Sequence, residues 1–396
     1  MLSRRAASLK PSPTLAISAK EKALKAQGVD IAGFGAGEPD FDTPAHIKEA
    51  AIKAINDNFT RYTPVTGIDP LKDAIIEKFS RDNGLAYKRE EVIVSCGGKH
   101  GLYNLFQAIC QEGDEVIVPT PFWVSYPPMI ELAGGTPVIL ETSEEDDYQI
   151  TPDLLKKYLT PRTKAIVLNY PSNPVGSVFY RENLEAIGRL AVEKGFFLIS
   201  DEIYEKLVYD GYSHVSIASM DNAFKERTII CHGVSKTYAM TGWRIGYSAG
   251  PAAIIKAMGN IQSQSTSNPT SISQMAALAA LSGEQDFIGR MVAEFKMRKD
   301  FLVKSLRNIQ GVTCYDPKGA FYVFPNFNVV LGKRYKDRVV DTSTTLTEIL
   351  LDEFHTAVVP GVEFGKEGYL RLSFATSMDV IEKGVERIAR AVSSLS

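Results

Sequence analysis

Short apolar runs alternate with amphipathic segments from about residue 91 to residue 250 of the chain. Runs of this length and composition predict buried strands at residues 116–118, 138–140, 165–168, 197–199 and 229–231. Among them, residues 181–194 place apolar side chains at helical spacing and are followed by Gly195. Strands that alternate with helices predict an α/β fold with a mostly parallel sheet covered by helices on both faces.

The pattern changes after Pro251. Amphipathic stretches at residues 274–281 and 284–309 predict longer helices. They are followed by predicted strands and a last predicted helix, at residues 319–324, 357–359, 369–373 and 378–392. This order predicts a second, smaller α+β domain.

Composition narrows the class of protein. The 396 residues are 44% hydrophobic with a formal net charge of −3, so we expect neither a basic nucleic-acid-binding surface nor a charged disordered tail. No run reaches the ~18 apolar residues of a membrane span, and no signal peptide is expected. The four cysteines lack Cys-x-x-Cys spacing, so neither a disulfide framework nor a metal site is expected. We expect a soluble, cytoplasmic protein.

Lys236 is the first candidate for chemistry because it lies in an otherwise uncharged run of small and aromatic residues at 233–243. A lysine amine becomes nucleophilic where its surroundings disfavour the ammonium form, so Lys236 is a candidate Schiff-base lysine. Ser235 and Arg244 offer the hydroxyl and the forked cation that bind phosphate. A surface lysine beside a glycine turn is the alternative interpretation.

Polar residues follow two of the predicted strands. Asn173 lies in a turn rich in proline and glycine after the run at 165–168, while Asp201 closely follows the run at 197–199 and precedes Tyr204 by three residues. Open α/β sheets bind ligands at the carboxyl ends of their strands. A buried Asp201 would need a cationic partner, such as a protonated pyridine nitrogen. The alternative is that Asp201 caps a helix.

A glycine-rich turn forms a further candidate site. The strand-like run at 91–95 leads into Gly97, Gly98 and Lys99, and helical spacing follows. Free N–H groups at the start of a helix bind phosphate, and glycines let the phosphate approach closely. A Gly-Gly turn between a strand and a helix is also common without a ligand.

Taken in this order, the motifs resemble those of the fold-type I, class I aminotransferases that use pyridoxal 5′-phosphate, most closely the bacterial aspartate aminotransferase branch. The resemblance runs from residues 10–12 to residues 371–374 and beyond. It implies a large coenzyme-binding domain at 46–283 with a seven-stranded, mostly parallel sheet. It also implies a discontinuous small domain made of 1–45 and 284–396, and a homodimer with shared active sites.

The resemblance implies a role for each matching residue. Lys236 would hold the coenzyme covalently and move the substrate proton, and Asp201 would keep the pyridine nitrogen protonated. The other implied coenzyme contacts are Tyr204 and Asn173 at the phenolic oxygen, Gly98, Lys99, Ser235 and Arg244 at the phosphate, Trp123 on the ring, and Tyr62 from the neighbouring subunit. Without the resemblance, Trp123 is equally well explained as a core residue.

Arg371 is the candidate for binding the α-carboxylate of the substrate. It lies in the middle of a predicted strand among apolar neighbours, where a charge is costly unless it is paired. The guanidinium fork fits a carboxylate, and an ion pair with an internal acid is the alternative. Gly37 matches a family glycine whose backbone faces the same end of the substrate.

The substrate side chain is the part that the motifs constrain least. Animal-type aspartate aminotransferases bind the second carboxylate with an arginine of the partner subunit, but the corresponding stretch at 262–269 contains none. Lys99 and Thr14 match a lysine and a threonine that the bacterial branch associates with acidic substrates, including prephenate. Alternatively, Lys99 only neutralises the phosphate.

These features predict transfer of the amino group of L-aspartate to 2-oxoglutarate by a ping-pong mechanism. A bifunctional aspartate/prephenate enzyme, which would form arogenate, and an aromatic or alanine aminotransferase are alternatives. A β-lyase or a decarboxylase would use the same Lys236 and Asp201. The fold also occurs as the effector domain of transcription regulators, which we do not expect here because the chain begins within a few residues of the aminotransferase fold.

Overall fold

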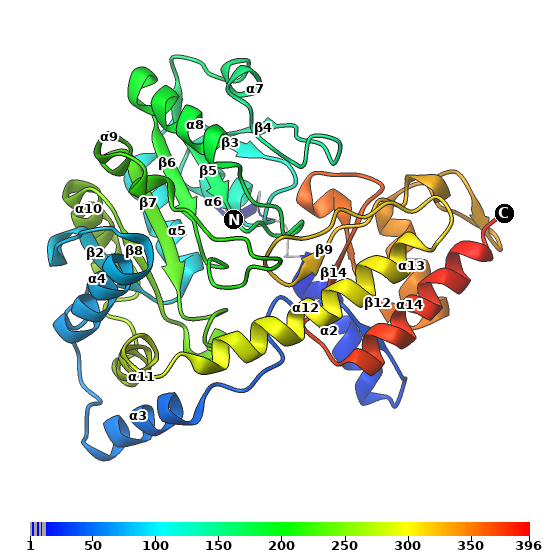
Figure 1. Cartoon of the computed structure of the whole chain (residues 1–396), viewed down its shortest axis with the longest axis horizontal. Helices are drawn as coiled ribbons and strands as arrows, with labels where there is room; N and C mark the ends of the chain where they lie inside the picture. Colours follow the sequence, from blue (N-terminus) through cyan, green and yellow to red (C-terminus); the bar gives the residue numbers. More distant parts are fainter. Residues whose placement is uncertain (1, 4–5, 8, 10–12) are drawn as a thin grey trace.

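The chain forms two lobes that are joined by a long helix (Figure 1). The computed structural model describes residues 2–3, 6–7, 9 and 13–396, without the side chains of residues 13–16 and 18. One lobe contains a seven-stranded sheet, and the other contains a three-stranded sheet with two long helices. Helix α12 (Asp286–Arg307) begins against the core of the first lobe and packs along the core of the second.

The large sheet is mostly parallel, as predicted. Its strands lie in the order β2 (Val92–Ser95), β8 (Gly246–Ala249), β7 (Thr228–Gly233), β6 (Phe197–Asp201), β5 (Thr163–Asn169), β3 (Glu115–Pro119) and β4 (Thr136–Leu140). Strand β8 runs antiparallel to both of its neighbours, and the other pairs are parallel. The sequence prediction omitted β8, whose residues Gly-Tyr-Ser-Ala form no continuous apolar run.

Helices cover both faces of this sheet, because successive strand side chains point to opposite sides. In β3, Val116 and Val118 join one core cluster, whereas Ile117 joins another. One face carries α5 (Gly98–Ile109), α6 (Tyr126–Leu132) and α10 (Ala252–Ser265). The opposite face carries α4 (Asp69–Asn83), α7 (Pro152–Lys156), α8 (Arg181–Lys194), α9 (Asn222–Lys225) and α11 (Ser271–Ser282), with α3 (Ala45–Asn56) packed on α11.

Helix α8 shows how closely local sequence defines an element. It has the predicted bounds, and its apolar stripe, including Leu184 and Ile187, is buried. Gly195 ends it in the left-handed region with a φ of +81°. A side chain there would be strained, which explains a glycine at this position.

The second lobe contains shorter strands than the sequence predicted. The predicted strand at 319–324 is reduced to β9 (Tyr322–Val323), because Ala320 adopts a positive φ of +58° that breaks the extended chain. The predicted strand at 357–359 is divided between β12 (Thr356–Ala357) and β13 (Val359–Pro360), which pair with different partners. The remaining elements are β14 (Leu370–Ser373), β10 (Arg334–Tyr335), β11 (Arg338–Val339), α13 (Ser343–Phe354) and α14 (Met378–Ser393).

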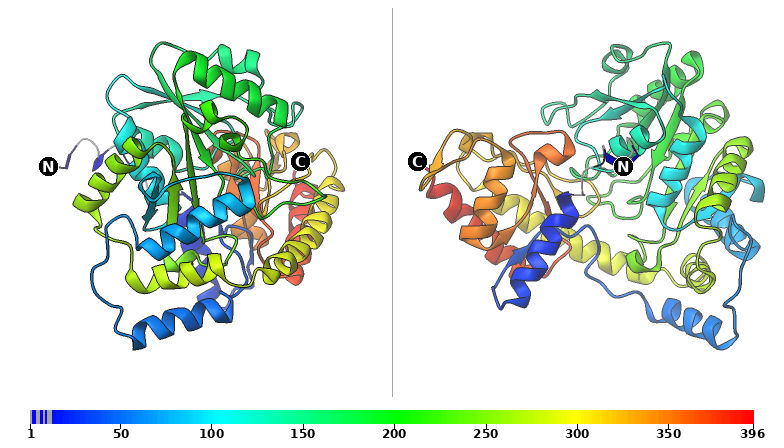
Figure 2. Two further views of the ribbon diagram at one scale, coloured as in Figure 1. Left: turned by 60° about the vertical axis from the view of Figure 1, so that its left-hand side comes forward. Right: turned by 180° about the vertical axis from the view of Figure 1, so that it is seen from behind.

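Residues 13–33 pack on this second lobe. Strand β1 (Ala32–Gly33) pairs in parallel with β12, and α2 (Pro13–Ala26), dark blue in Figure 2, contacts β12 and β13. The domain boundaries at 46–283 and at 1–45 with 284–396 stay predictions, because Tyr204 and Tyr209 of the first lobe belong to the apolar core of the second. The described part of the chain also contains short 3-10 helices: η1 (Arg89–Glu91), η2 (Ile217–Ser219), η3 (Thr241–Trp243), η4 (Asn328–Val330) and η5 (Gly361–Phe364).

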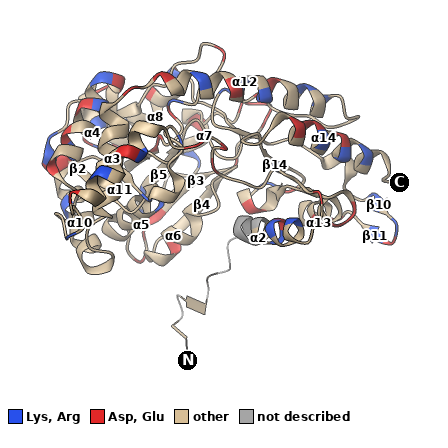
Figure 3. Cartoon of the chain, turned by 90° about the horizontal axis from the view of Figure 1, so that it is seen from below, with Lys and Arg blue, Asp and Glu red and all other residues tan. Residues whose placement is uncertain are grey.

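Charged residues of both signs are interspersed along the outer helices, including α3, α12 and α14 (Figure 3). Among the described residues, no helix combines the length and apolarity needed to cross a bilayer.

Candidate active site

A cavity of about 550 Å³ lies where the two lobes meet. This volume is in the range of small-molecule sites. The predicted site residues that line the cavity are Gly37, Gly98, Lys99, Trp123, Asn173, Asp201, Tyr204, Ser235, Lys236, Arg244 and Arg371. Residues more than 330 positions apart in sequence, such as Gly37 and Arg371, therefore line the same cavity.

The topology explains this convergence. Strands β5, β6 and β7 are parallel, and β2 runs in the same direction because β8 is antiparallel to both β2 and β7. The carboxyl ends of all four strands therefore meet at one edge of the sheet. At this edge the strand register places Asn169 beside Asp201, and Asp201 beside Cys231.

Lys236 lies in the loop that follows β7 and reaches into the cavity. Its amine donates a hydrogen bond to the carbonyl oxygen of Gly37. Burial lowers the pKa of Lys236 to about 8, against an opposing effect of Glu38. About a tenth of the amine is therefore neutral at pH 7, far more than for an exposed lysine, and the neutral form is what a nucleophile and proton carrier requires. The alternative of a surface lysine is wrong.

Asp201 ends β6 and is buried at the floor of the cavity. Its Oδ2 accepts a hydrogen bond of 2.6 Å from the Tyr126 hydroxyl, and its Oδ1 accepts one of 3.3 Å from the N–H of Ile203. Burial raises the pKa of Asp201, although these two hydrogen bonds oppose it. Turns and not a helix directly follow Asp201, so the capping alternative is wrong. A carboxylate buried in this way fits a cationic ring nitrogen.

The start of α5 forms a cradle for an anion. The helix begins at Gly98, and Gly97 before it has a φ of +95°. A Cβ atom on Gly97 would overlap the guanidinium of Arg244, so only glycine allows that close approach. Arg244 is held by a 2.8 Å hydrogen bond from its Nη1 to the carbonyl oxygen of Thr241. Together with Ser235, this donor set suits a phosphate group.

Arg371 lies on β14, on the second-lobe side of the cavity, and is 2% exposed. Its Nη2 donates to the carbonyl oxygen of Gly35 at 2.9 Å, and its Nη1 donates to Asn173 Oδ1 at 3.3 Å. Burial lowers the pKa of Arg371. The Nε atom is buried without a hydrogen-bond partner. The partners that the structure shows are neutral oxygens, so the guanidinium can still bind an incoming carboxylate.

Trp123 and Lys99 form another part of the wall. The Lys99 ammonium lies 4.9 Å from the centre of the Trp123 ring, which in turn meets Tyr126 edge to face. Burial lowers the pKa of Lys99, and the nearby Arg244 adds to this effect. An anion between Lys99 and Arg244 would relieve their repulsion.

The single chain does not test the roles of two predicted residues, Tyr62 and Thr14. Tyr62 is 91% exposed and does not line the cavity of its own chain. The backbone of Thr14 belongs to α2, but its side chain lies outside the described part of the structure. Their predicted roles stay predictions.

Sequence reasoning missed several residues of the site. Tyr126 holds Asp201, Tyr322 approaches Tyr204, and Asn169 accepts a 2.8 Å hydrogen bond from the N–H of Asn173. Tyr126 follows Trp123 by three positions, a spacing that could have placed both on one side of a turn. Tyr322 lies in the run at 319–324, which the apolar pattern predicted as a strand without indicating a role for its tyrosine.

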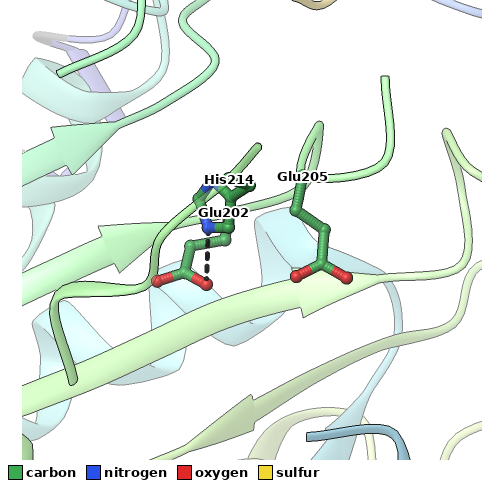
Figure 4. Close-up of side chains that lie close together, drawn as sticks. All are labelled: Glu202, Glu205 and His214. Atoms are coloured by element: carbon green, nitrogen blue, oxygen red, sulfur yellow. Dashed lines mark hydrogen bonds and ion pairs between the residues drawn. The ribbon is translucent and has the colours of Figure 1, made fainter. Parts of the chain in front are cut away.

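A second cluster of titratable side chains, Glu202, Glu205 and His214, lies outside the residues that line the cavity (Figure 4). Glu202 Oε1 accepts hydrogen bonds of 2.7 Å from the hydroxyls of Ser200 and Ser216, and its Oε2 lies 3.1 Å from His214 Nε2.

Glu205 of this cluster forms a buried ion pair with Lys78. Although burial disfavours the charge, Lys78 and His232 lower the pKa of Glu205 well below its usual range. Since Lys78 pairs with Glu205, and hydroxyl and imidazole groups hold Glu202, we interpret the cluster as a polar network that joins the segment after β6 to α4.

Comparison with known proteins agrees with this geometry. The family model of aminotransferase class I and II matches residues 29–388. An aspartate aminotransferase of Geobacillus stearothermophilus is 52% identical over 98% of both chains. An aspartate/prephenate aminotransferase of Nitrosomonas europaea is 49% identical over 99% of this chain and all of its own. The crystal structure of the aspartate aminotransferase of Rhizobium meliloti has a TM-score of 0.96 at 42% identity, covering both chains completely.

The chain therefore belongs to the class I and II aminotransferases. It is an enzyme of this family with the fold of the solved aspartate aminotransferases.

Proposed function

We propose that this protein transfers the amino group of L-aspartate to 2-oxoglutarate, giving oxaloacetate and L-glutamate, with pyridoxal 5′-phosphate as its coenzyme. The observation that carries the proposal is the arrangement of three buried groups in one cavity: the Lys236 amine, the Asp201 carboxylate and the Arg371 guanidinium. They provide a nucleophile, a partner for a cationic ring and a receptor for a carboxylate.

Bound pyridoxal phosphate supplies an aldehyde that an amine can join and a ring that accepts electrons from the substrate. Asp201 holds the proton on the ring nitrogen. The Tyr204 hydroxyl would donate a hydrogen bond to the phenolic oxygen. The amide nitrogen of Asn173 would do the same, because its Oδ1 already accepts a hydrogen bond from Arg371. Lys236 is the amine that would hold the coenzyme, and the same amine would accept the proton from the substrate Cα.

The phosphate is held by the backbone of Gly98 and Lys99 and by the side chains of Ser235 and Arg244. Trp123, which lines the cavity, would pack against the coenzyme ring. Arg371 binds the substrate α-carboxylate, and the backbone of Gly37 faces the same end of the substrate.

The basic side chain of Lys99 in the cavity wall supports an acidic substrate. Lys99 is the cation of the cavity wall next to Trp123, and the stretch at 262–269 offers no arginine. A Thermus thermophilus aspartate aminotransferase, 45% identical over 99% of both chains with a TM-score of 0.93, was solved with the dicarboxylate maleate. We therefore infer that Lys99, with Thr14, binds the distal carboxylate. Prephenate, which is also a dicarboxylate, is the second candidate substrate, since a relative at 49% identity carries that name.

We further propose a cytoplasmic homodimer in which Tyr62 completes the phosphate site of the neighbouring subunit. Tyr62 is 91% exposed in the single chain, as expected of a side chain that contacts a second copy. The proposed domains are 46–283 for the coenzyme and 1–45 with 284–396 for closing over the substrate.

A half-reaction tests the function directly. Coenzyme-loaded protein is mixed with aspartate alone, and oxaloacetate and the amine form of the coenzyme are quantified. A transaminase forms one equivalent of each per site and then stops until a 2-oxo acid is added. Catalytic release of ammonia or carbon dioxide would instead identify a lyase or a decarboxylase. The same assay with prephenate, alanine and phenylalanine defines the donor range.

Lys99→Ala is expected to lower kcat/KM for aspartate and prephenate by about ten- to a hundredfold, since losing a charge-assisted contact costs about 1.5–3 kcal/mol. Alanine has no distal carboxylate, so its kcat/KM should be unchanged and serves as the internal control. An equal loss for all three substrates, together with weaker coenzyme binding, would show that Lys99 serves the phosphate instead.

Tyr62→Phe is expected to weaken coenzyme retention by about three- to tenfold, the effect of one hydrogen bond, without changing substrate preference. Coenzyme release during dialysis measures this effect. Tyr180→Phe is the matched control, because Tyr180 is another exposed tyrosine and bonds Asp147 away from the cavity. Unchanged retention, or an active monomer in sedimentation, would refute the assignment.

A further inference from the structure

Tyr322 lies between the coenzyme half and the substrate half of the cavity. It is on β9, is 1% exposed and lines the cavity. In the antiparallel pair with β14 it lies opposite Ser373, so Arg371, two residues away on β14, is its diagonal neighbour on the same face. The strand register thus brings one phenol beside the carboxylate-binding arginine.

The hydroxyl of Tyr322 faces the coenzyme half. It lies 3.0 Å from the hydroxyl of Tyr204. A Cβ atom on Gly37 would lie 3.4 Å from the same hydroxyl, so the Gly37 backbone passes close to it. The carbonyl oxygen of Gly37 accepts the hydrogen bond from the Lys236 amine. One hydroxyl therefore contacts Tyr204 and approaches the segment that holds the nucleophile.

The ring of Tyr322 faces the substrate half. The guanidinium carbon of Arg371 lies 4.7 Å from the centre of this ring and 5.1 Å from that of Phe364. Aromatic faces attract a cation without neutralising it. The Arg371 guanidinium is therefore held in place while its charge stays available to a carboxylate.

We propose that Tyr322 is a positioning residue with two roles. Its hydroxyl donates a hydrogen bond to Tyr204, so that the Tyr204 hydroxyl in turn donates its own hydrogen bond to the phenolic oxygen of the coenzyme. Its ring fixes Arg371 for the substrate. Each phenol has a single proton. If Tyr204 donated to Tyr322, it would have none left for the coenzyme. This inference rests on the proposed function, because it assumes that Tyr204 contacts the coenzyme.

The test uses the coenzyme-loaded protein and the pH midpoint of its visible absorption band. This midpoint reports protonation of the nitrogen that joins Lys236 to the coenzyme. Tyr322→Phe should move it to higher pH, since a weaker hydrogen bond leaves more negative charge on the phenolic oxygen beside that nitrogen. Charged groups that act on Lys236 stay in place in this variant: Glu38, Arg371, Arg244 and Asp201.

A double-mutant cycle shows whether Tyr322 acts through Tyr204. Tyr204→Phe should shift the midpoint further than Tyr322→Phe, and the double variant should shift no further than Tyr204→Phe alone. Additive shifts, or an unchanged midpoint in Tyr322→Phe, overturn the proposal. Tyr209→Phe is the matched control, because Tyr209 is buried in the same core and donates to the carbonyl oxygen of Ala320. It should leave the midpoint unchanged.

The ring is tested separately with Tyr322→Leu. Tyr322→Phe keeps a ring beside Arg371 and should bind maleate as the unchanged protein does. Tyr322→Leu should weaken maleate binding by about threefold to tenfold, the effect of losing a cation–π contact in a buried site. Weaker binding in both variants, or in neither, contradicts a role for the ring. If the unchanged protein shows no visible band with the coenzyme, the proposed function fails instead.

Discussion

Replacing Lys236 with alanine is expected to lower kcat/KM for aspartate by about ten thousandfold or more, because one amine both holds the coenzyme and transfers the proton. The visible absorption band of the covalently bound coenzyme should disappear. The fold should survive, since the side chain projects into a cavity and its hydrogen bond is to a single loop carbonyl, that of Gly37. Steady-state turnover, absorbance and thermal unfolding measure the three effects.

Lys256→Ala is the control for this experiment, because Lys256 is an exposed lysine on α10 and does not line the cavity. It should retain full turnover. A small soluble amine added to Lys236→Ala should restore part of the proton transfer but not the covalent attachment. Near-normal turnover of Lys236→Ala without added amine would remove Lys236 from both roles.

The large sheet and most of the site were predictable because parallel strands leave a strong local signal. Strands β5 and β6 contain continuous apolar runs that are buried on both faces, and the polar residues that end them, Asn169 and Asp201, line the cavity. Since parallel strands end at a common edge, Asn173 and Asp201 could be brought together without knowing the rest of the fold. The family motifs then supplied Arg371 and Gly37, which lie far away in sequence.

The second lobe was predicted less accurately, because its strands are short and irregular. Ala320 has a positive φ that no apolar pattern indicates, so the predicted strand at 319–324 was too long. In the large sheet, strand β8 was missed for a related reason: it is held by pairing with two neighbours and not by its own hydrophobicity. Tertiary context overrides weak local preference in such short segments.

The contacts of Tyr126 and Tyr322 could not be predicted for a different reason. Both are buried tyrosines in apolar surroundings, which is ordinary for core residues. What distinguishes them is the partner of each hydroxyl, Asp201 for one and Tyr204 for the other. Those pairs join residues 75 and 118 positions apart, a separation at which a single sequence gives no signal.

The Asp201 carboxylate is expected to matter for catalysis and not for folding. Burial raises the pKa of Asp201 in the protein without its cationic partner, so the charge is a cost to the coenzyme-free fold. Asp201→Asn keeps the shape of the side chain and removes the charge. The thermal unfolding temperature of the coenzyme-free variant should therefore be equal to or higher than that of the unchanged protein.

Catalysis should respond in the opposite way: Asp201→Asn is expected to lower kcat by about a thousandfold or more, while the binding of maleate at Arg371 changes little. An amide cannot hold a proton on the ring nitrogen, so the ring accepts electrons poorly. A coenzyme analogue methylated on that nitrogen carries a permanent positive charge and should restore part of the lost rate. Asp221→Asn is the matched control, because Asp221 caps α9 through an oxygen that asparagine also offers. Full activity of Asp201→Asn, or an equal loss with the methylated analogue, would show that Asp201 does not act through the charge of the ring.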